Sequence, residues 1–219
     1  MVSYGDVRAN EKVKIYIQRA DESLITMGFT EHSFPHVTKV AEDAKFILRT
    51  LGYSERDVEL VRIAGYLHDI GNVINRVDHA QSGAVMAFRI LDEMGMDPEE
   101  IATIITAIGN HDEHTAFPVS PIAAALILAD KSDVRMSRVR NRAFASFDIH
   151  DRVNYSVKSA KLLINEDLTH IELRLSIDTT HCAVMDYFEI FLGRMILCRK
   201  AAERLNLRFV LNINDQQLI

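Results

Sequence analysis

The stretch Ala64-Gly-Tyr-Leu-His-Asp-Ile-Gly71 decides the fold and the chemistry of this chain. It places His68 next to Asp69 at the end of an apolar helical segment, and Gly71 then stops that helix. An imidazole beside a carboxylate offers a divalent metal one nitrogen and one oxygen ligand, and the carboxylate can also bridge to a second metal. The pair therefore indicates a metal centre at a helix end.

Helical periodicity extends from this stretch through the first 150 residues. Glycines at 28, 52 and 95 stop three of the apolar segments, while Asp-Pro and Ser-Pro pairs open two others. The expected helices lie near 7–27, 35–52, 57–68 and 79–94, with two more that open at 97–100 and 120–121. We therefore expect an all-α bundle over residues 1–150.

The pattern changes beyond Asp148. Residues 153–165 and 168–178 alternate in the period-two manner of strands, and a long helix near 181–206 and a short strand at 208–213 follow. The fold class is therefore mainly α, with a helical bundle followed by a small C-terminal α+β (ββαβ) appendage over residues 151–219.

The appendage needs a partner surface, because a sheet this small leaves its strand edges exposed. We expect it to pack on the bundle or to pair with another subunit. The 181–206 helix carries more apolar surface than one helix needs. Packing within the chain and a homodimer interface are the two alternatives for that surface.

The composition is that of a globular protein, with 48% hydrophobic and 26% charged residues. The net charge of −6 argues against a partner such as a nucleic-acid duplex, which requires a dominant basic surface. No signal-peptide pattern opens the chain, and the apolar run at 122–129 is too short to span a bilayer. Cys182 and Cys198, expected roughly 24 Å apart on one helix, suit free thiols in a reducing compartment. We therefore expect a cytoplasmic protein without a membrane partner.

Further candidate metal ligands stand before and after the His68–Asp69 pair, each near an expected helix end: His36, His79, His111 and Asp130. Over residues 30–140, this order resembles the HD-domain superfamily of metal-dependent phosphohydrolases. The resemblance implies a bundle of five or so helices. It also implies that one metal is bound by His36, His68, Asp69 and Asp130.

Two of the histidines are similar to those of the two-metal branch of that superfamily, which includes the HD-GYP phosphodiesterases. His79 begins a His-x-x-x-Gly-Ala stretch, and His111 stands in the place of their His-His-Glu. The resemblance implies that His79 and His111 hold a second metal and that Asp69 bridges the two.

Other positions depart from that branch. Asn72 stands where many relatives have a lysine placed for phosphate, Asp112 replaces the second histidine, and no Gly-Tyr-Pro follows. We therefore do not expect a cyclic-di-GMP phosphodiesterase. Asp112 and His114 are the alternatives for a residue that completes the second site. The remaining histidines lack matching spacing and are predicted to be structural or solvent-facing: His32, His150, His170 and His181.

The mixed nitrogen and oxygen ligands suit a divalent transition metal (Mn, Fe, Co, Ni or Zn), with Mg as an alternative. The resemblance to the two-metal branch implies two ions, and two metals about 3.5–4 Å apart can clamp the attacking and leaving oxygens of a phosphoryl displacement. His68 and Asp69 are accordingly predicted to be catalytic, through metal-activated water.

Basic residues follow Asp130 and would share one helical stripe: Lys131, Arg135, Arg138 and Arg142. Such a run is usually a solvated helix face. This one leads out of the metal site, and arginine forks match phosphate oxygens. Lys131 and Arg135 are therefore candidate substrate-binding residues, together with Arg76, which follows the His-Asp motif.

Together these features predict an enzyme, a phosphomonoesterase or phosphodiesterase that hydrolyses a nucleotide or another small phosphate ester. Two alternatives use the same residues. The inositol oxygenase branch of the superfamily is similar in its six ligands, which implies an HD-type di-iron oxygenase as the first. A non-catalytic sensing or scaffold module, with the appendage as its interaction surface, is the second. The basic residues after Asp130 favour a phosphate substrate, and the complete ligand set argues against an inactive site.

Overall fold

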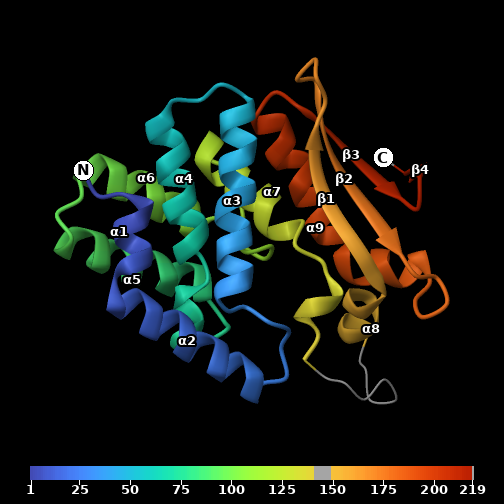
Figure 1. Cartoon of the computed structure of the whole chain (residues 1–219), viewed down its shortest axis with the longest axis horizontal. Coiled ribbons are helices and arrows are strands. Elements are labelled where there is room, and N and C mark those ends of the chain that lie inside the picture. Colours follow the sequence, from blue (N-terminus) through green and yellow to red (C-terminus); the bar gives the residue numbers. More distant parts are fainter. Residues whose placement is uncertain (141–148, 219) are drawn as a thin grey trace.

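The computed structural model describes residues 1–140 and 149–218, and Figure 1 shows how its elements are arranged. The N-terminal part contains the helices α1 (Tyr4–Ala9), α2 (Glu11–Thr26), α3 (Phe34–Thr50), α4 (Glu55–Leu67), α5 (His79–Glu93), α6 (Pro98–Gly109) and α7 (Pro121–Lys131), with a 3-10 turn η1 (Ile70–Val73). A second 3-10 turn, η2 (Met136–Arg138), precedes the C-terminal elements α8 (Ile149–Ser156), β1 (Val157–Ile164), β2 (His170–Ile177), α9 (Val184–Arg204), β3 (Arg208–Ile213) and β4 (Gln216–Gln217). The mainly α fold class with an α+β appendage is confirmed.

Helix α7 is the centre of the bundle. Its residues from Ile122 to Ala129 are at most 5% exposed, because α3, α4, α6 and α9 all pack around it. A helix that is apolar on every side must be buried on every side, which explains the continuous apolar run. Asp130, at the end of this helix, is thereby held at a fixed point inside the molecule.

Two glycines allow backbones to approach closely around the His-Asp pair. A Cβ at Gly65 in α4 would lie 2.8 Å from the Cα of Ala41 in α3. A Cβ at Gly71 would lie 2.1 Å from the backbone oxygen of His79 and 2.5 Å from the backbone nitrogen of Gly83. The turn after Asp69 therefore rests directly on the first turns of α5, which places His79 beside the pair.

The expected single helix near 7–27 is wrong, since the structure has two helices there. Asn10 leaves the helical conformation, and its side-chain oxygen accepts hydrogen bonds from the backbone nitrogens of Lys12 and Val13. Asparagine is a favoured N-cap for this reason. The residue thus ends α1 and starts α2.

The C-terminal strands form one sheet in the order β1-β2-β3-β4. Strands β1 and β2 pair antiparallel, β2 and β3 pair parallel across α9, and β4 adds an antiparallel edge that the sequence did not predict. The expected strand start at residue 153 is also wrong, because α8 continues to Ser156 and β1 begins at Val157.

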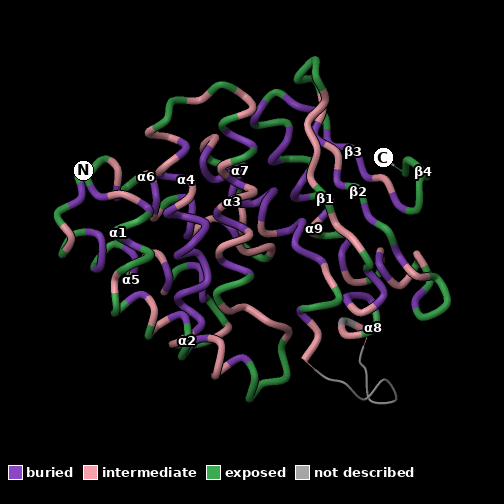
Figure 2. Tube along the Cα trace, viewed as in Figure 1, coloured by how far each residue is buried: buried purple, intermediate pink, exposed green. Residues whose placement is uncertain are grey.

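Helix α9 joins the appendage to the bundle. It contacts both α7 and β3, and one hydrophobic core includes residues of both parts. Figure 2 shows buried segments in both parts of the chain. Cys198 lies in α9, whereas Cys182 lies just before the helix rather than in it; both thiols are free and buried. The division into domains at residue 150 and a homodimer interface stay predictions.

Among the described residues, no helix combines the length and the apolarity needed to cross a membrane.

Candidate metal centre

Six side chains that stand at or beside helix ends converge in the bundle, and they are the six predicted ligands. His36 is in the first turn of α3, and His79 is the first residue of α5. The others follow or end helices: His68 caps α4, Asp69 precedes η1, His111 follows α6 and Asp130 lies near the end of α7. Helix packing thus brings together residues up to 94 positions apart in the chain.

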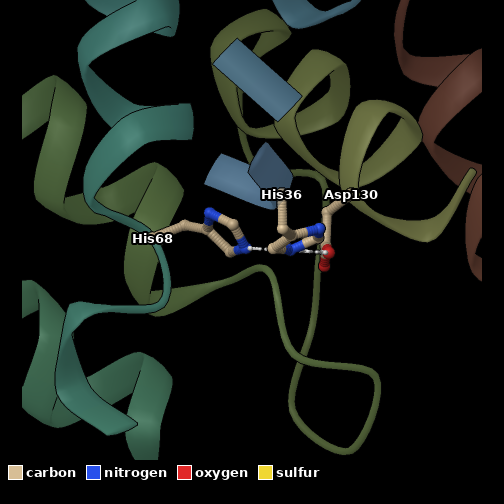
Figure 3. A group of neighbouring side chains, drawn as sticks. All are labelled: His36, His68 and Asp130. Atoms are coloured by element: carbon tan, nitrogen blue, oxygen red, sulfur yellow. Dashed lines mark hydrogen bonds and ion pairs between the residues drawn. The ribbon is translucent and has the colours of Figure 1, made fainter. Parts of the chain in front are cut away.

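The first ligand group consists of His36, His68, Asp69 and Asp130. The Nε2 atoms of His36 and His68 lie 3.3 Å apart, and each lies 3.5–3.6 Å from Oδ1 of Asp130. Asp69 Oδ2 lies 3.5 Å from His36 Nε2 and 3.4 Å from His68 Nε2. Figure 3 shows the side chains of His36, His68 and Asp130 pointing toward one another. Four ligand atoms around a tetrahedral ion with bonds of about 2.1 Å lie about 3.4 Å apart, so this spacing fits a metal.

The second ligand group contains His79, His111 and the other oxygen of Asp69. Asp69 Oδ1 lies 3.4 Å from His79 Nε2, which lies 3.2 Å from His111 Nε2. The ligand atoms of His68, Asp69 and His111 also lie within 4.8 Å of one another. Asp69 therefore presents one carboxylate oxygen to each group, the geometry that a bridging ligand requires.

Hydrogen bonds fix the ring of every histidine in the two groups. Each Nδ1–H donates outward, so the lone pair of each Nε2 points inward. The acceptors are the Asp133 carboxylate for His36 (2.8 Å) and the backbone oxygens of Gly65, Arg76 and Ile108 for His68 (2.8 Å), His79 (3.0 Å) and His111 (2.6 Å). Two inward lone pairs at 3.2–3.3 Å repel each other unless a cation or a proton lies between them. The arrangement therefore suits bound cations.

The charges differ between the two groups. Burial disfavours a charged His68, yet the carboxylates of Asp69 and Asp130 raise the pKa of its imidazole to about 10. Burial and, for His111, the charge of His68 lower the pKa values of His79 and His111. The carboxylates of the first group thus stabilise positive charge within it. The histidines of the second group are neutral imidazoles, the form that binds metals.

Two residues that the sequence did not assign support the ligands. Asp133 is buried and accepts from Nδ1 of His36; burial acts to raise its pKa, but His36 and Arg138 hold that pKa far below its usual range. Asn72 donates from Nδ2 to Oδ1 of Asp69 at 2.9 Å. Asn72 thus holds the Asp69 carboxylate in one orientation. The spacing of Asp133, three residues after Asp130, is the only sequence signal for its role.

Replacing Asp133 by asparagine is expected to weaken metal binding about tenfold while the fold is retained. Asparagine can still accept from His36, but it removes the negative charge that makes the ring a stronger donor to metal, and such supporting residues are worth about 10–100-fold in affinity. Competition against a fluorescent chelator measures the effect. Asp112→Asn, outside both groups, is the control. Equal affinities for wild type and Asp133→Asn would contradict this role.

A charged network lies beside the first group. Lys131 Nζ lies 2.7 Å from Oδ2 of Asp130 and 2.6 Å from Oε2 of Glu113, and Nε of Arg194 in α9 donates to Oε1 of Glu113 at 2.7 Å. Burial acts to raise the pKa of Glu113, but Lys131 and Arg194 hold it well below its usual range. Sequence reasoning missed both Glu113 and Arg194, because their contact spans 81 residues.

A cavity of about 330 Å³ opens onto the ligands Asp69, His79, His111 and Asp130. Its volume is at the lower end of the range for small-molecule pockets. The other lining residues include four cations, Arg76, Lys131, Arg138 and Arg194, and apolar and polar side chains from both parts of the chain, Met27, Phe29, His32, Asp151, Asn154 and Phe191. The appendage thus forms part of the cavity wall.

The candidate substrate-binding residues separate in the structure. Arg76 and Lys131 line the cavity, whereas Arg135 does not and instead binds Asp133 (Nε to Oδ1, 2.6 Å). The expected helical stripe is wrong: α7 ends at Lys131, and Arg138 lies in η2, where it donates to backbone oxygens. Arg142 lies outside the described residues.

The structure also shows where the remaining candidate residues lie. His114 is exposed and Asp112 half-buried, and neither belongs to the ligand groups found among the described residues. His32, predicted to be structural or solvent-facing, lines the cavity instead, with its ring 5.4 Å from that of His36. Its place four residues before His36 is the sequence signal for this position.

The chain is similar to known proteins over part of its length. The HD domain family model matches residues 34–137, which contain all six candidate ligands. A solved structure of a predicted HD superfamily hydrolase from an uncultured Thermotogales bacterium is 27% identical, covers 57% of this chain and 67% of its own, and has a TM-score of 0.45. No curated protein matches the chain significantly. The chain therefore contains an HD domain over residues 34–137.

Proposed function

We propose that this protein is a metal-dependent hydrolase of a phosphate ester, a phosphomonoesterase or phosphodiesterase that acts on a nucleotide or another small phosphate compound. The observation that carries the proposal is the pair of ligand groups that share Asp69 and open onto a cavity lined by arginines. We further propose that each group holds one divalent ion, Mn, Fe, Co, Ni or Zn, with Mg as the alternative.

The ligands fit that role by their chemistry. When bound, such ions lower the pKa of a water molecule and offset negative charge on phosphoryl oxygens. Asp69 keeps the two groups at a fixed separation, since Asn72 holds its carboxylate. His68 presents the lone pair of Nε2 to the site, because its Nδ1–H donates a hydrogen bond to the backbone oxygen of Gly65.

Cations on the cavity wall favour an anionic substrate over a neutral one. Arg76 Nη1 lies 3.8 Å from Oδ1 of Asp69 and donates to Asn72 at 3.3 Å, which places its guanidinium beside the second ligand group. A fixed cation at this point stabilises charge that develops on a phosphoryl oxygen. This feature favours the hydrolase over the oxygenase alternative.

Metal content and turnover together test the proposal. Protein purified without chelator is analysed for metals, then stripped and reloaded with each candidate ion. Phosphate release is measured against a panel of nucleoside monophosphates, cyclic nucleotides and simple phosphodiesters. We expect two ions per chain and hydrolysis with at least one of them. A protein that hydrolyses nothing, but consumes O₂ when loaded with iron, would show the oxygenase alternative to be correct.

A further inference from the structure

Helix α9 brings Arg194 to the wall of the metal-ligand cavity. Two contacts fix the plane of its guanidinium: Nε donates to Glu113 Oε1 at 2.7 Å, and Cζ lies 4.6 Å from the centre of the Phe191 ring. Within the described part of the chain, Nη1 and Nη2 have no hydrogen-bond acceptor. The side chain is 25% exposed and lines the cavity.

Lys131, by contrast, is already bound. Its ammonium lies between the carboxylates of Asp130 and Glu113 and is buried. It therefore holds the outer oxygen of Asp130, leaving Oδ1 for the first ligand group. A buried ammonium between two carboxylates has little capacity left for a third anion.

The charges of this network balance, because Lys131 and Arg194 face the two carboxylates of Glu113 and Asp130. Arg194 is the cation of the network that keeps donors without an acceptor among the described residues. A guanidinium fork matches the oxygen pair of a phosphate or carboxylate and binds it bidentately. Arg76 lies beside His79 of the second ligand group, whereas Arg194 is linked to Asp130 of the first group through Glu113 and Lys131.

We propose that Arg194 binds an oxyanion of the substrate, a phosphate or a carboxylate, and that Glu113 is the positioning residue that aims it. The appendage then takes part in choosing the substrate. This inference rests on the proposed function for the reaction itself, but anion binding can be measured without turnover.

Calorimetric titration of the Mn-loaded, full-length protein with inorganic phosphate and with malonate tests the inference. Arg194→Ala should weaken phosphate binding about tenfold, because it removes charge-assisted hydrogen bonds. Arg194→Lys should bind phosphate more tightly than Arg194→Ala and more weakly than wild type, since lysine keeps the charge but loses the two parallel donors of the guanidinium. Arg199→Ala, an exposed arginine on the same helix, is the matched control and should bind as wild type. Manganese content should be the same in all four proteins.

The two anions distinguish between a phosphate and a carboxylate as the group that Arg194 binds. A parallel loss of malonate binding indicates a carboxylate as well as a phosphate, and a loss for phosphate alone indicates a phosphate. Glu113→Gln should weaken phosphate binding in the wild-type background but add little to Arg194→Ala, as a positioning role requires. If Arg194→Ala binds both anions as tightly as wild type does, or wild type binds neither, the inference is wrong.

Kinetics give an independent readout once a substrate is known. Arg194→Ala should raise KM about tenfold and change kcat less, because a contact that is already made with the bound substrate contributes binding to ground and transition states alike. If wild type hydrolyses no ester, the proposed function fails, while the titration still decides whether Arg194 binds an anion.

Discussion

Asp69→Ala should lose its bound metal and all measurable turnover while keeping the fold. The carboxylate gives Oδ2 to His36 and His68 and Oδ1 to His79, so one substitution removes a ligand from both groups. The loss of metal affinity should be larger than for a residue that only supports a ligand, whose removal weakens binding about 10–100-fold. Elemental analysis, phosphate release and circular dichroism measure the three quantities.

The control for this variant is Asp112→Ala. Asp112 is also an aspartate next to a candidate ligand histidine, but it lies outside both ligand groups. It should keep wild-type metal content. An Asp69→Ala protein that still carries two ions per chain, or that hydrolyses at the wild-type rate, would refute the bridging role.

Gly71→Ala should destabilise the protein strongly and displace His79. The new Cβ would lie 2.1 Å from the His79 oxygen and 2.5 Å from the Gly83 nitrogen, and these backbone atoms cannot rotate away as a side chain can. Overpacking costs about 1–3 kcal/mol where side chains can adjust, so we expect an effect at or above the top of that range. Urea unfolding measures the free energy, and metal analysis reports the second ligand group.

Gly193→Ala is the matched control for that substitution. It lies in α9, and nothing lies within 4 Å of its added Cβ. Alanine in a helix is more stable than glycine by about 0.5–1 kcal/mol, so this variant should unfold at a higher urea concentration. A Gly71→Ala protein with the wild-type midpoint would show that the turn can move away from α5 at little cost.

The sequence predicted those features that depend on local pattern. Helices with clear caps, such as the one opened by Asp97-Pro98, appear where expected. The six candidate ligands could be singled out from the sequence because each stands near an expected helix end, and the structure brings them together; their binding of metal stays a prediction. The first helix was predicted too long, because its apolar spacing continues across Asn10 while the cap interrupts it.

Features that depend on contacts distant in the chain could not be predicted. Arg135 was expected to face the site on a continued helix, but α7 ends at Lys131 and the arginine binds Asp133. Arg194 and Glu113 meet only because α9 docks against α7, and no periodicity in α9 indicates which of its polar residues faces the cavity. Strand alternation likewise misled at residues 153–156, which are helical.

The burial of Cys198 makes the reactivity of its thiol a measure of how stably α9 packs on α7. This thiol lies one turn after Arg194, and burial raises its pKa to about 12, so it is scarcely ionised near neutral pH. Alkylating reagents attack the thiolate. They can therefore modify Cys198 appreciably only during moments when α9 separates from α7. The alkylation rate of Cys198 thus measures how often α9, which carries Arg194, separates from α7. A ligand bound to Arg194 would lower that rate.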